Sequence, residues 1–121
     1  MYQVIEGGVA AASGFRVGHT AAGIKYRERA DMALLVSDSS CAAAGVFTRN
    51  VVKAAPVLWD RRIVREKGTA RAIVVNAGIA NACTGQRGLR VCGKTADCAA
   101  RALGLAPEEV LLASTGVIGM D

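Results

Sequence analysis

Four cysteines, Cys41, Cys83, Cys92 and Cys98, and one histidine, His19, are the side chains best suited to metal or disulfide chemistry. No two cysteines form a Cys-x-x-Cys pair, and the histidine lies far from all of them in the sequence. Structural zinc sites usually show closely spaced ligands, so we expect no metal site. The N-terminus lacks a secretory signal, which favours free, buried thiols over disulfides. Without a histidine nearby, Cys83 is expected to be a packed thiol rather than a nucleophile.

The segment Gly88–Thr95 matches the P-loop pattern, in which backbone amides and a lysine, here Lys94, hold phosphates. A P-loop follows a strand directly, whereas Gly85-Gln86-Arg87 precedes this segment. Leu89 and Cys92 also belong to an apolar stripe that continues at helical spacing. We therefore expect the first turns of an amphipathic helix here, and nucleotide binding remains a minor alternative.

The composition is that of a globular domain. The chain has 121 residues, of which 52% are hydrophobic and 21% charged. No apolar run approaches the ~20 residues that a membrane-spanning helix needs, so we expect a cytoplasmic protein without a membrane partner.

Aromatic content and charge argue against nucleic-acid binding. Aromatic residues make up only 4%, too few for a platform on which bases stack. The net charge of +5 comes mostly from dispersed side chains, and its one cluster is interpreted as a solvated helix face: Arg61, Arg62, Arg65 and Lys67. A mildly positive surface also suits an anionic small-molecule substrate.

Strand and helix signals alternate along the chain. Strands are expected within 15–25, 31–37, 43–48, 72–76 and 110–113, the last ending in Ser114-Thr115-Gly116. One helix is expected between Pro56 and Gly68, and a second from Leu89 to Leu103 with Gly104 as its C-cap. A brief helical turn is expected at 107–109. This mixture predicts an α/β or α+β domain.

Several separate blocks in a fixed order carry a resemblance to a known family. The chain resembles the N-terminal part of the ornithine acetyltransferases, the glutamate N-acetyltransferases of arginine biosynthesis. The resemblance runs from about Gly7 to Gly119 and rests on these blocks: Gly7-Gly8-Val9, Gly14-Phe15, Ala22-Gly23-Ile24-Lys25, Ser37-Asp38, Ala43-Ala44-Gly45-Val46-Phe47-Thr48-Arg49-Asn50, Ala54-Ala55-Pro56-Val57, Val75-Asn76-Ala77-Gly78, Ala80-Asn81-Ala82-Cys83-Thr84-Gly85 and Ala113-Ser114-Thr115-Gly116-Val117-Ile118-Gly119.

The resemblance implies a fold and an activity. The fold is an α/β (α+β) sandwich, with sheets flanked by helices. The enzyme moves an acetyl group from N-acetylornithine to glutamate through an acetyl-enzyme, and acetyl-CoA is a co-substrate of some members; no other cofactor is implied. The precursor cleaves itself into α and β chains, and the new N-terminal threonine of β is the nucleophile, with its α-amino group as the base.

Thr115 and Gly116 are the residues here onto which the family's chemistry carries over. The resemblance implies that the Thr115 hydroxyl and the Gly116 backbone N–H form an oxyanion hole for the tetrahedral intermediate. By itself, Ser114-Thr115-Gly116 would be interpreted as a structural turn. The loop Asn76–Gly85 either shapes the floor of the site and supports this segment, or is a tight structural turn.

Residues 1–121 are expected to form a single domain, a truncated α-chain portion that is inactive alone. The expected partner is the β chain of the same precursor, and the expected substrates are N-acetylornithine and glutamate. The competing interpretation is a non-catalytic binding or structural module that keeps the fold.

Overall fold

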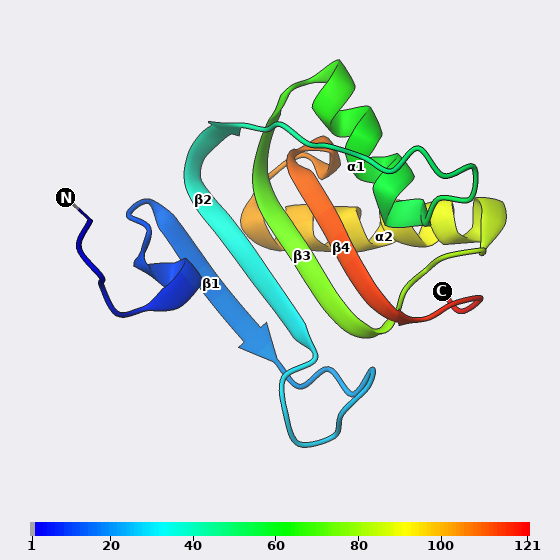
Figure 1. The fold of residues 1–121 in the computed structure, drawn as a ribbon, viewed down its shortest axis with the longest axis horizontal. Coiled ribbons are helices and arrows are strands. Elements are labelled where there is room, and N and C mark those ends of the chain that lie inside the picture. Colours follow the sequence, from blue (N-terminus) through cyan, green and yellow to red (C-terminus); the bar gives the residue numbers. More distant parts are fainter. Residues whose placement is uncertain (1) are drawn as a thin grey trace.

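The computed structural model describes residues 2–121, and its centre is one mixed four-stranded sheet (Figure 1). The strands lie side by side in chain order: β1 (Phe15–Thr20), β2 (Met32–Ala42), β3 (Thr69–Ile79) and β4 (Val110–Val117). Neighbours are antiparallel except β3 and β4, which are parallel. A parallel pair needs a long crossover, which a helix supplies here.

Two helices, α1 (Ala55–Glu66) and α2 (Gly85–Leu103), lie on one side of the sheet (Figure 1). Pro56 occupies the first turn of α1, where its missing N–H costs nothing, and Gly104 ends α2 in a left-handed conformation. Short 3-10 turns, η1 (Gly8–Ala11) and η2 (Pro107–Glu109), complete the fold. None of the helices in residues 2–121 combines the length and apolar character needed to cross a membrane.

The core lies between the helices and one face of the sheet. Small side chains fill it, which lets the helices lie close to the sheet, as the low aromatic content suggests. One row of cross-strand neighbours facing the helices is Gly18, Leu34, Val74 and Leu112. The buried core residues are Val36, Ala55, Ala72, Cys92, Ala96, Ala100, Val110 and Leu112.

The opposite side of the sheet, called here the open face, carries no helix (Figure 1). Because side chains alternate along a strand, the residues between the core positions point to this face. They include one apolar row that crosses all four strands: Val17, Leu35, Ile73 and Leu111. Val17 is 43% exposed and the other three are partly buried, so this row is in partial contact with solvent.

Helix α1 covers the outer edge of β4 with two side chains. The Trp59 indole Nε1 donates to the Val110 carbonyl at 2.9 Å, and the Leu112 amide donates to the Asp60 carboxylate at 2.9 Å. These bonds satisfy backbone groups that an edge strand otherwise leaves unpaired. Burial raises the pKa of Asp60 to about 6, and the bond from Leu112 opposes this rise.

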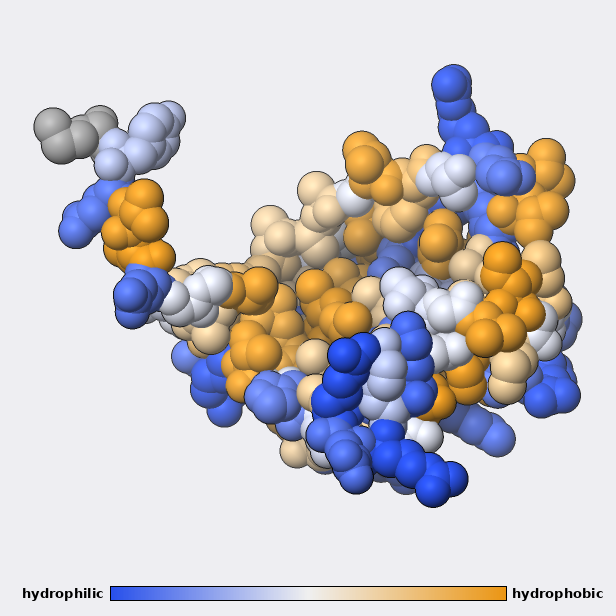
Figure 2. All heavy atoms as spheres, turned by 60° about the horizontal axis from the view of Figure 1, so that its bottom comes forward, coloured by the Kyte–Doolittle hydropathy of each residue, from blue (hydrophilic) through white to orange (hydrophobic). Residues whose placement is uncertain are grey.

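The loop between β1 and β2 is organised by the buried carboxylate of Asp31. Its two oxygens accept the amides of Ala22 at 2.7 Å, Lys25 at 2.7 Å and Tyr26 at 3.1 Å. The Asp31 carbonyl also accepts the Ala77 amide of β3 at 2.8 Å. These bonds to backbone N–H groups, that of Lys25 first, lower the pKa of Asp31 to about 2. Figure 2 shows hydrophilic side chains gathered where this loop comes forward.

Several sequence expectations are confirmed. The α+β class is observed, and both helices are present with their C-terminal ends where Gly68 and Gly104 placed them, but α2 begins at Gly85 rather than at the expected Leu89. The P-loop-like segment Gly88–Thr95 lies entirely within α2, so no open phosphate-binding loop exists there and the nucleotide alternative is wrong. The cluster Arg61, Arg62, Arg65 and Lys67 lies on α1 and its C-cap, where Arg62 stacks on the Trp59 ring at 4.6 Å.

Other expectations are wrong in their boundaries. Segment 43–48 is not a strand; after the Ala43 amide bonds to the Gly68 carbonyl it leaves the sheet, and Val46 is fully exposed. Its apolar residues mimic a strand, but no neighbouring strand is available to pair with them. Conversely, β4 continues through Thr115 and Gly116 because both pair with β3, so these residues are not a turn.

Replacing Asp60 by asparagine is expected to stabilise the chain above pH 6. A carboxylate whose pKa is raised by folding costs stability as pH rises from about 4 to about 6, because the folded state must then bury the charge. The asparagine side chain keeps the acceptor for Leu112 without the charge. Allowing for solvent screening, the gain is roughly 1 kcal/mol at pH 7.5 and vanishes near pH 4. Thermal unfolding at both pH values measures it, with exposed Glu66→Gln as the control; a pH-independent difference would contradict this account.

Replacing Asp31 by asparagine is expected to loosen the loop 21–30. The amide keeps one acceptor oxygen but turns an N–H group toward backbone donors that the second carboxylate oxygen now accepts. Hydrogen exchange should accelerate in residues 21–30 while α2 is unaffected. The wild-type loop should loosen in the same way as pH falls from about 4 to about 2, because the lowered pKa means that the stabilisation is lost there. Asp38→Asn, at a carboxylate 57% exposed, is the control; equal exchange in both variants would refute the assignment.

Candidate active site

Thr115, expected to bind an oxyanion, lies on β4 with its side chain on the open face. Its side chain points to the face opposite that of the core residue Leu112 and to the same face as that of Ala113. Thr115 is exposed, and its hydroxyl makes no hydrogen bond to another residue of the described part of the chain. The hydroxyl is therefore available to donate to a ligand on this face.

A shallow cavity of about 190 Å³ lies beside Thr115. It is formed where the ends of β1, β2 and β3 meet the loop held by Asp31. His19, Asp31 and Asn76 contribute polar groups to its lining, and the remaining lining is mostly apolar: Ala30, Met32, Ala33, Val75 and Ala77. A small substrate on the open face can thus reach the Thr115 hydroxyl.

Gly116 occupies a position that no other residue fits. Its φ is 136°, and a Cβ there would collide with the carbonyl group of Gly78, its partner on β3. Gly78 is restricted from its other side, because a Cβ there would lie 2.9 Å from Cβ of Lys25 in the β1–β2 loop. At this point β3 and β4 are therefore packed backbone to backbone, and the loop packs on Gly78 through Lys25 and Ile24.

The direction of the Gly116 amide follows from the alternation of peptide groups along β4. The Val110 carbonyl and the Leu112 amide both bond to α1. The backbone N–H and C=O groups of the even-numbered residues of β4 therefore point away from β3. The Val117 carbonyl accepts the Ala80 amide at 3.0 Å on the β3 side, so the alternation holds to the end of the strand. The Gly116 N–H consequently points to the outer edge rather than into the ladder with β3.

The loop that follows β3 is built on two asparagines. Asn76, half-buried on β3 itself, donates to the Ile79 carbonyl at 2.9 Å. Asn81 is buried and donates to the Gly88 carbonyl at 3.0 Å, which joins the loop to the first turn of α2. The segment expected as the loop 76–85 therefore begins as a strand and supports the ends of β3 and α2.

The structure separates the four cysteines. Cys92 is buried in the core, where burial raises the pKa of its thiol to about 11. Cys41 is half-buried beside the Ser37 hydroxyl at 3.0 Å. Cys83 and Cys98 are exposed, so the expectation of a packed thiol at Cys83 is wrong; its loop turns the residue outward with φ 58°. Within residues 2–121 no three His, Cys, Asp or Glu side chains are placed to hold a metal ion.

Sequence reasoning missed that His19 and Asp31 line the same cavity as Thr115. Both stand at the borders of the β1–β2 loop, and only the register of four strands brings them to this cavity. A lone acidic residue directly before an apolar strand was the one available signal for Asp31.

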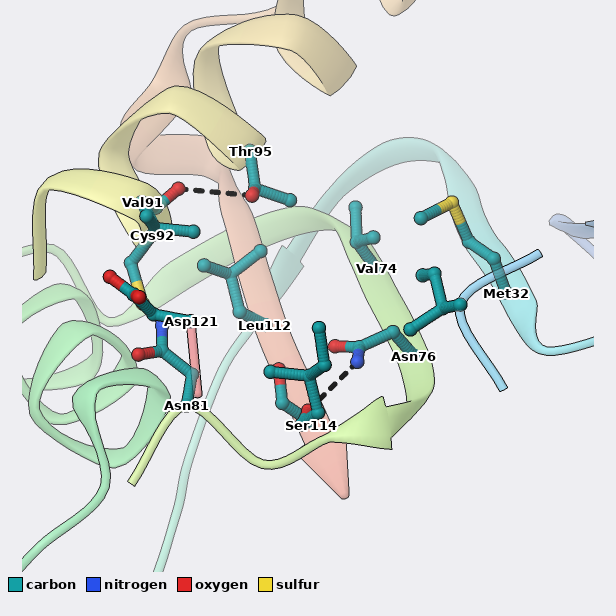
Figure 3. Close-up of a pocket in the computed structure, with 12 residues that line it drawn as sticks. Met32, Val74, Asn76, Asn81, Val91, Cys92, Thr95, Leu112, Ser114 and Asp121 are labelled. Carbon is teal, nitrogen blue, oxygen red and sulfur yellow. Dashed lines mark hydrogen bonds between the residues drawn. The ribbon is translucent and has the colours of Figure 1, made fainter. Parts of the chain in front are cut away.

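A second cavity, of about 150 Å³, lies on the helix-facing side of the sheet, between β3, β4 and α2 (Figure 3). Asn76 and Ser114, which are cross-strand neighbours, line it together with Thr95 of α2. The sheet separates this cavity from the Thr115 side chain.

Comparison with known proteins places the chain in a family. The profile of the ArgJ family matches residues 16–121. The "Arginine biosynthesis bifunctional protein ArgJ" of Gloeobacter violaceus is 51% identical over 119 residues, covering 98% of this chain and 29% of the relative. The chain thus spans less than a third of that relative's length.

Two solved structures agree with this match. The crystal structure of the arginine biosynthesis bifunctional protein from Bacillus halodurans has a TM-score of 0.87 at 37% identity, over 93% of this chain and 59% of that one. Ornithine acetyltransferase from Mycobacterium tuberculosis, in complex with ornithine, has a TM-score of 0.87 at 47% identity, over 93% and 61%. The resemblance inferred from the sequence blocks is confirmed, and the chain belongs to the ArgJ family.

Proposed function

We propose that this chain supplies the oxyanion hole of an acetyltransferase that moves an acetyl group from N-acetylornithine to glutamate in arginine biosynthesis, with acetyl-CoA as a further possible donor. The observation that carries the proposal lies at the end of β4, where an exposed Thr115 hydroxyl stands beside a cavity and the amide of the next residue points to the outer edge of the sheet, away from β3. The family to which the chain belongs supports the reaction class.

The chemistry follows from where negative charge develops. Attack on the acetyl carbonyl converts its oxygen into an oxyanion, which two preorganised donors stabilise better than the neutral carbonyl. The Thr115 O–H and the Gly116 N–H belong to consecutive residues, and the proposal is that one ligand oxygen accepts from both.

The attacking group is proposed to lie outside this chain, on the N-terminal threonine of a β chain made from the same precursor. The chain's length, 29% of the Gloeobacter violaceus relative, supports such a partner. The apolar row Val17, Leu35, Ile73 and Leu111, of which Val17 is exposed and the others partly buried, gives that partner a surface on the same side of the sheet as Thr115. Residues 1–121 then form one domain of the assembly, which we place in the cytoplasm.

Thr115→Ala is expected to lower kcat by about 100- to 1000-fold with little change in KM, because one donor to the transition-state oxyanion is lost. The variant is best made in the Gloeobacter violaceus relative with its matching segment replaced by this chain. Release of ornithine from N-acetylornithine, with glutamate as acceptor, measures turnover.

Thr115→Ser keeps the hydroxyl and is the matched control, expected to retain most of the rate. Gly116 offers no comparable test, because any side chain there collides with Gly78 and alters the fold. Unchanged turnover in Thr115→Ala would remove the oxyanion role and favour a non-catalytic module.

The chain alone is expected to show no acetyl exchange and to self-associate through its open face. Apolar side chains left in water favour association with any matching surface. Light scattering and acetyl exchange should be compared for the wild-type chain and for Val17→Thr, which makes the apolar row more polar and should reduce association. A monodisperse, active sample of the 121-residue chain would contradict the proposed need for a partner.

A further inference from the structure

Polar side chains that the proposed function does not use line the cavity shown in Figure 3. It lies on the helix-facing side of the sheet, opposite the Thr115 side chain. Its polar residues come from separate parts of the fold: Asn76, Asn81, Thr95, Ser114 and Asp121. In the view of Figure 3 they surround a space whose other walls are apolar.

Asp121 presents an unpaired carboxylate oxygen at this cavity. Its side chain is only 4% exposed, and its Oδ1 pairs with Nη2 of Arg87 at 2.7 Å. The other oxygen, Oδ2, is buried and has no hydrogen-bond partner among residues 2–121. Burying an acceptor without a donor is costly, and a carboxylate oxygen more so than a neutral one. The site therefore lacks a donor.

Two of the neighbouring side chains, Asn81 and Thr95, cannot provide that donor because their N–H and O–H groups already donate to other atoms. The Asn81 amide donates to the Gly88 carbonyl and to the Cys92 sulfur, and the Thr95 hydroxyl donates to the Val91 carbonyl at 3.0 Å. The Asn76 amide donates to the Ile79 carbonyl. The second Asn76 N–H and the Ser114 hydroxyl also line the cavity, but neither donates to Oδ2. Because Oδ2 still lacks a donor, a suitable ligand carries N–H donors of its own.

We propose that this cavity binds the primary ammonium group of a small aliphatic amine, with Asp121 as its counter-ion. An ammonium group carries a positive charge and three N–H donors and has no acceptor. It can therefore donate to Oδ2 of Asp121, which lacks a donor, and to other acceptors of the cavity. Cavities of ~150 Å³ hold molecules of benzene size, so an amine with a short carbon chain fits. Val74, Val91 and Leu112 give that carbon chain an apolar wall.

Thermal unfolding of the chain with propylammonium, methylammonium, tetramethylammonium and sodium chlorides at equal ionic strength tests the proposal. Propylammonium should raise the melting temperature most, since each buried methylene improves affinity by about fourfold. Tetramethylammonium and sodium should have no effect beyond ionic strength, because neither has an N–H donor. Equal effects of all four salts would overturn the proposal.

Two variants are expected to change binding in opposite directions. Asp121→Asn removes the counter-ion and should weaken propylammonium binding by at least about tenfold. Arg87→Gln removes the cation that now shares the carboxylate and should strengthen it. The exposed ion pair Arg101–Asp97, at 3.1 Å, supplies matched controls: Asp97→Asn and Arg101→Gln should leave binding unchanged.

Side-chain amide signals of Asn76 and Asn81 give a second readout that does not depend on stability. Both should shift on titration with propylammonium, because both line the cavity. Unmoved signals, or equal binding by wild type and Asp121→Asn, would show that the cavity holds water only. Neither measurement requires acetyl transfer, so its outcome is independent of the proposed function.

Discussion

The carboxylate of Asp31 is the interaction on which the geometry around Thr115 depends. It draws three amides of the β1–β2 loop together, and its own carbonyl ties the loop to β3. The loop so held packs against Gly78, and Gly78 in turn packs against Gly116. A charged group buried in the loop thus helps to fix, through contacts of the loop with Gly78 and of Gly78 with Gly116, the position of a strand end far later in the chain. Because close-packed atoms have little room to move, these contacts hold the end of β4 in a fixed position relative to the loop.

The same contacts explain why β4 can end with available donors. An edge strand normally exposes a row of unpaired backbone groups, and α1 covers the first of them through Trp59 and Asp60. The cover ends before Gly116, where the strand leaves the helix. At that point β4 is held by its contact with Gly78 of β3. This contact fixes the position of Gly116 and leaves its N–H directed to the outer edge of the sheet. Preorganisation of this kind is what oxyanion stabilisation requires, since donors that must first reorient lose much of their benefit.

Local sequence signals predicted the helices well and the strand ends poorly. Pro56, Gly68 and Gly104 mark helix ends because their backbone requirements are local. Strand pairing is not local: segment 43–48 is apolar enough for a strand but meets no partner, whereas Ser114-Thr115-Gly116 looks like a turn and is a strand because β3 lies beside it. Thr115 itself came from the family resemblance. The roles of Asp31 and Gly78 needed the register of the sheet, which no short window of residues contains.

The sheet separates its helix-facing side from its open face, and consecutive residues of each strand contribute to the two sides in turn. On β4, Ser114 faces the helices and Thr115 faces away, so adjacent residues contact different cavities. Asn76 on β3 borders both cavities, and its amide fixes the turn after β3 through Ile79. A ligand that orders the helix-side cavity would therefore act on the same strand ends that hold the Thr115 side. Since β3 and β4 are joined there by the glycine contact, a shift of one strand relative to the other changes both cavities together.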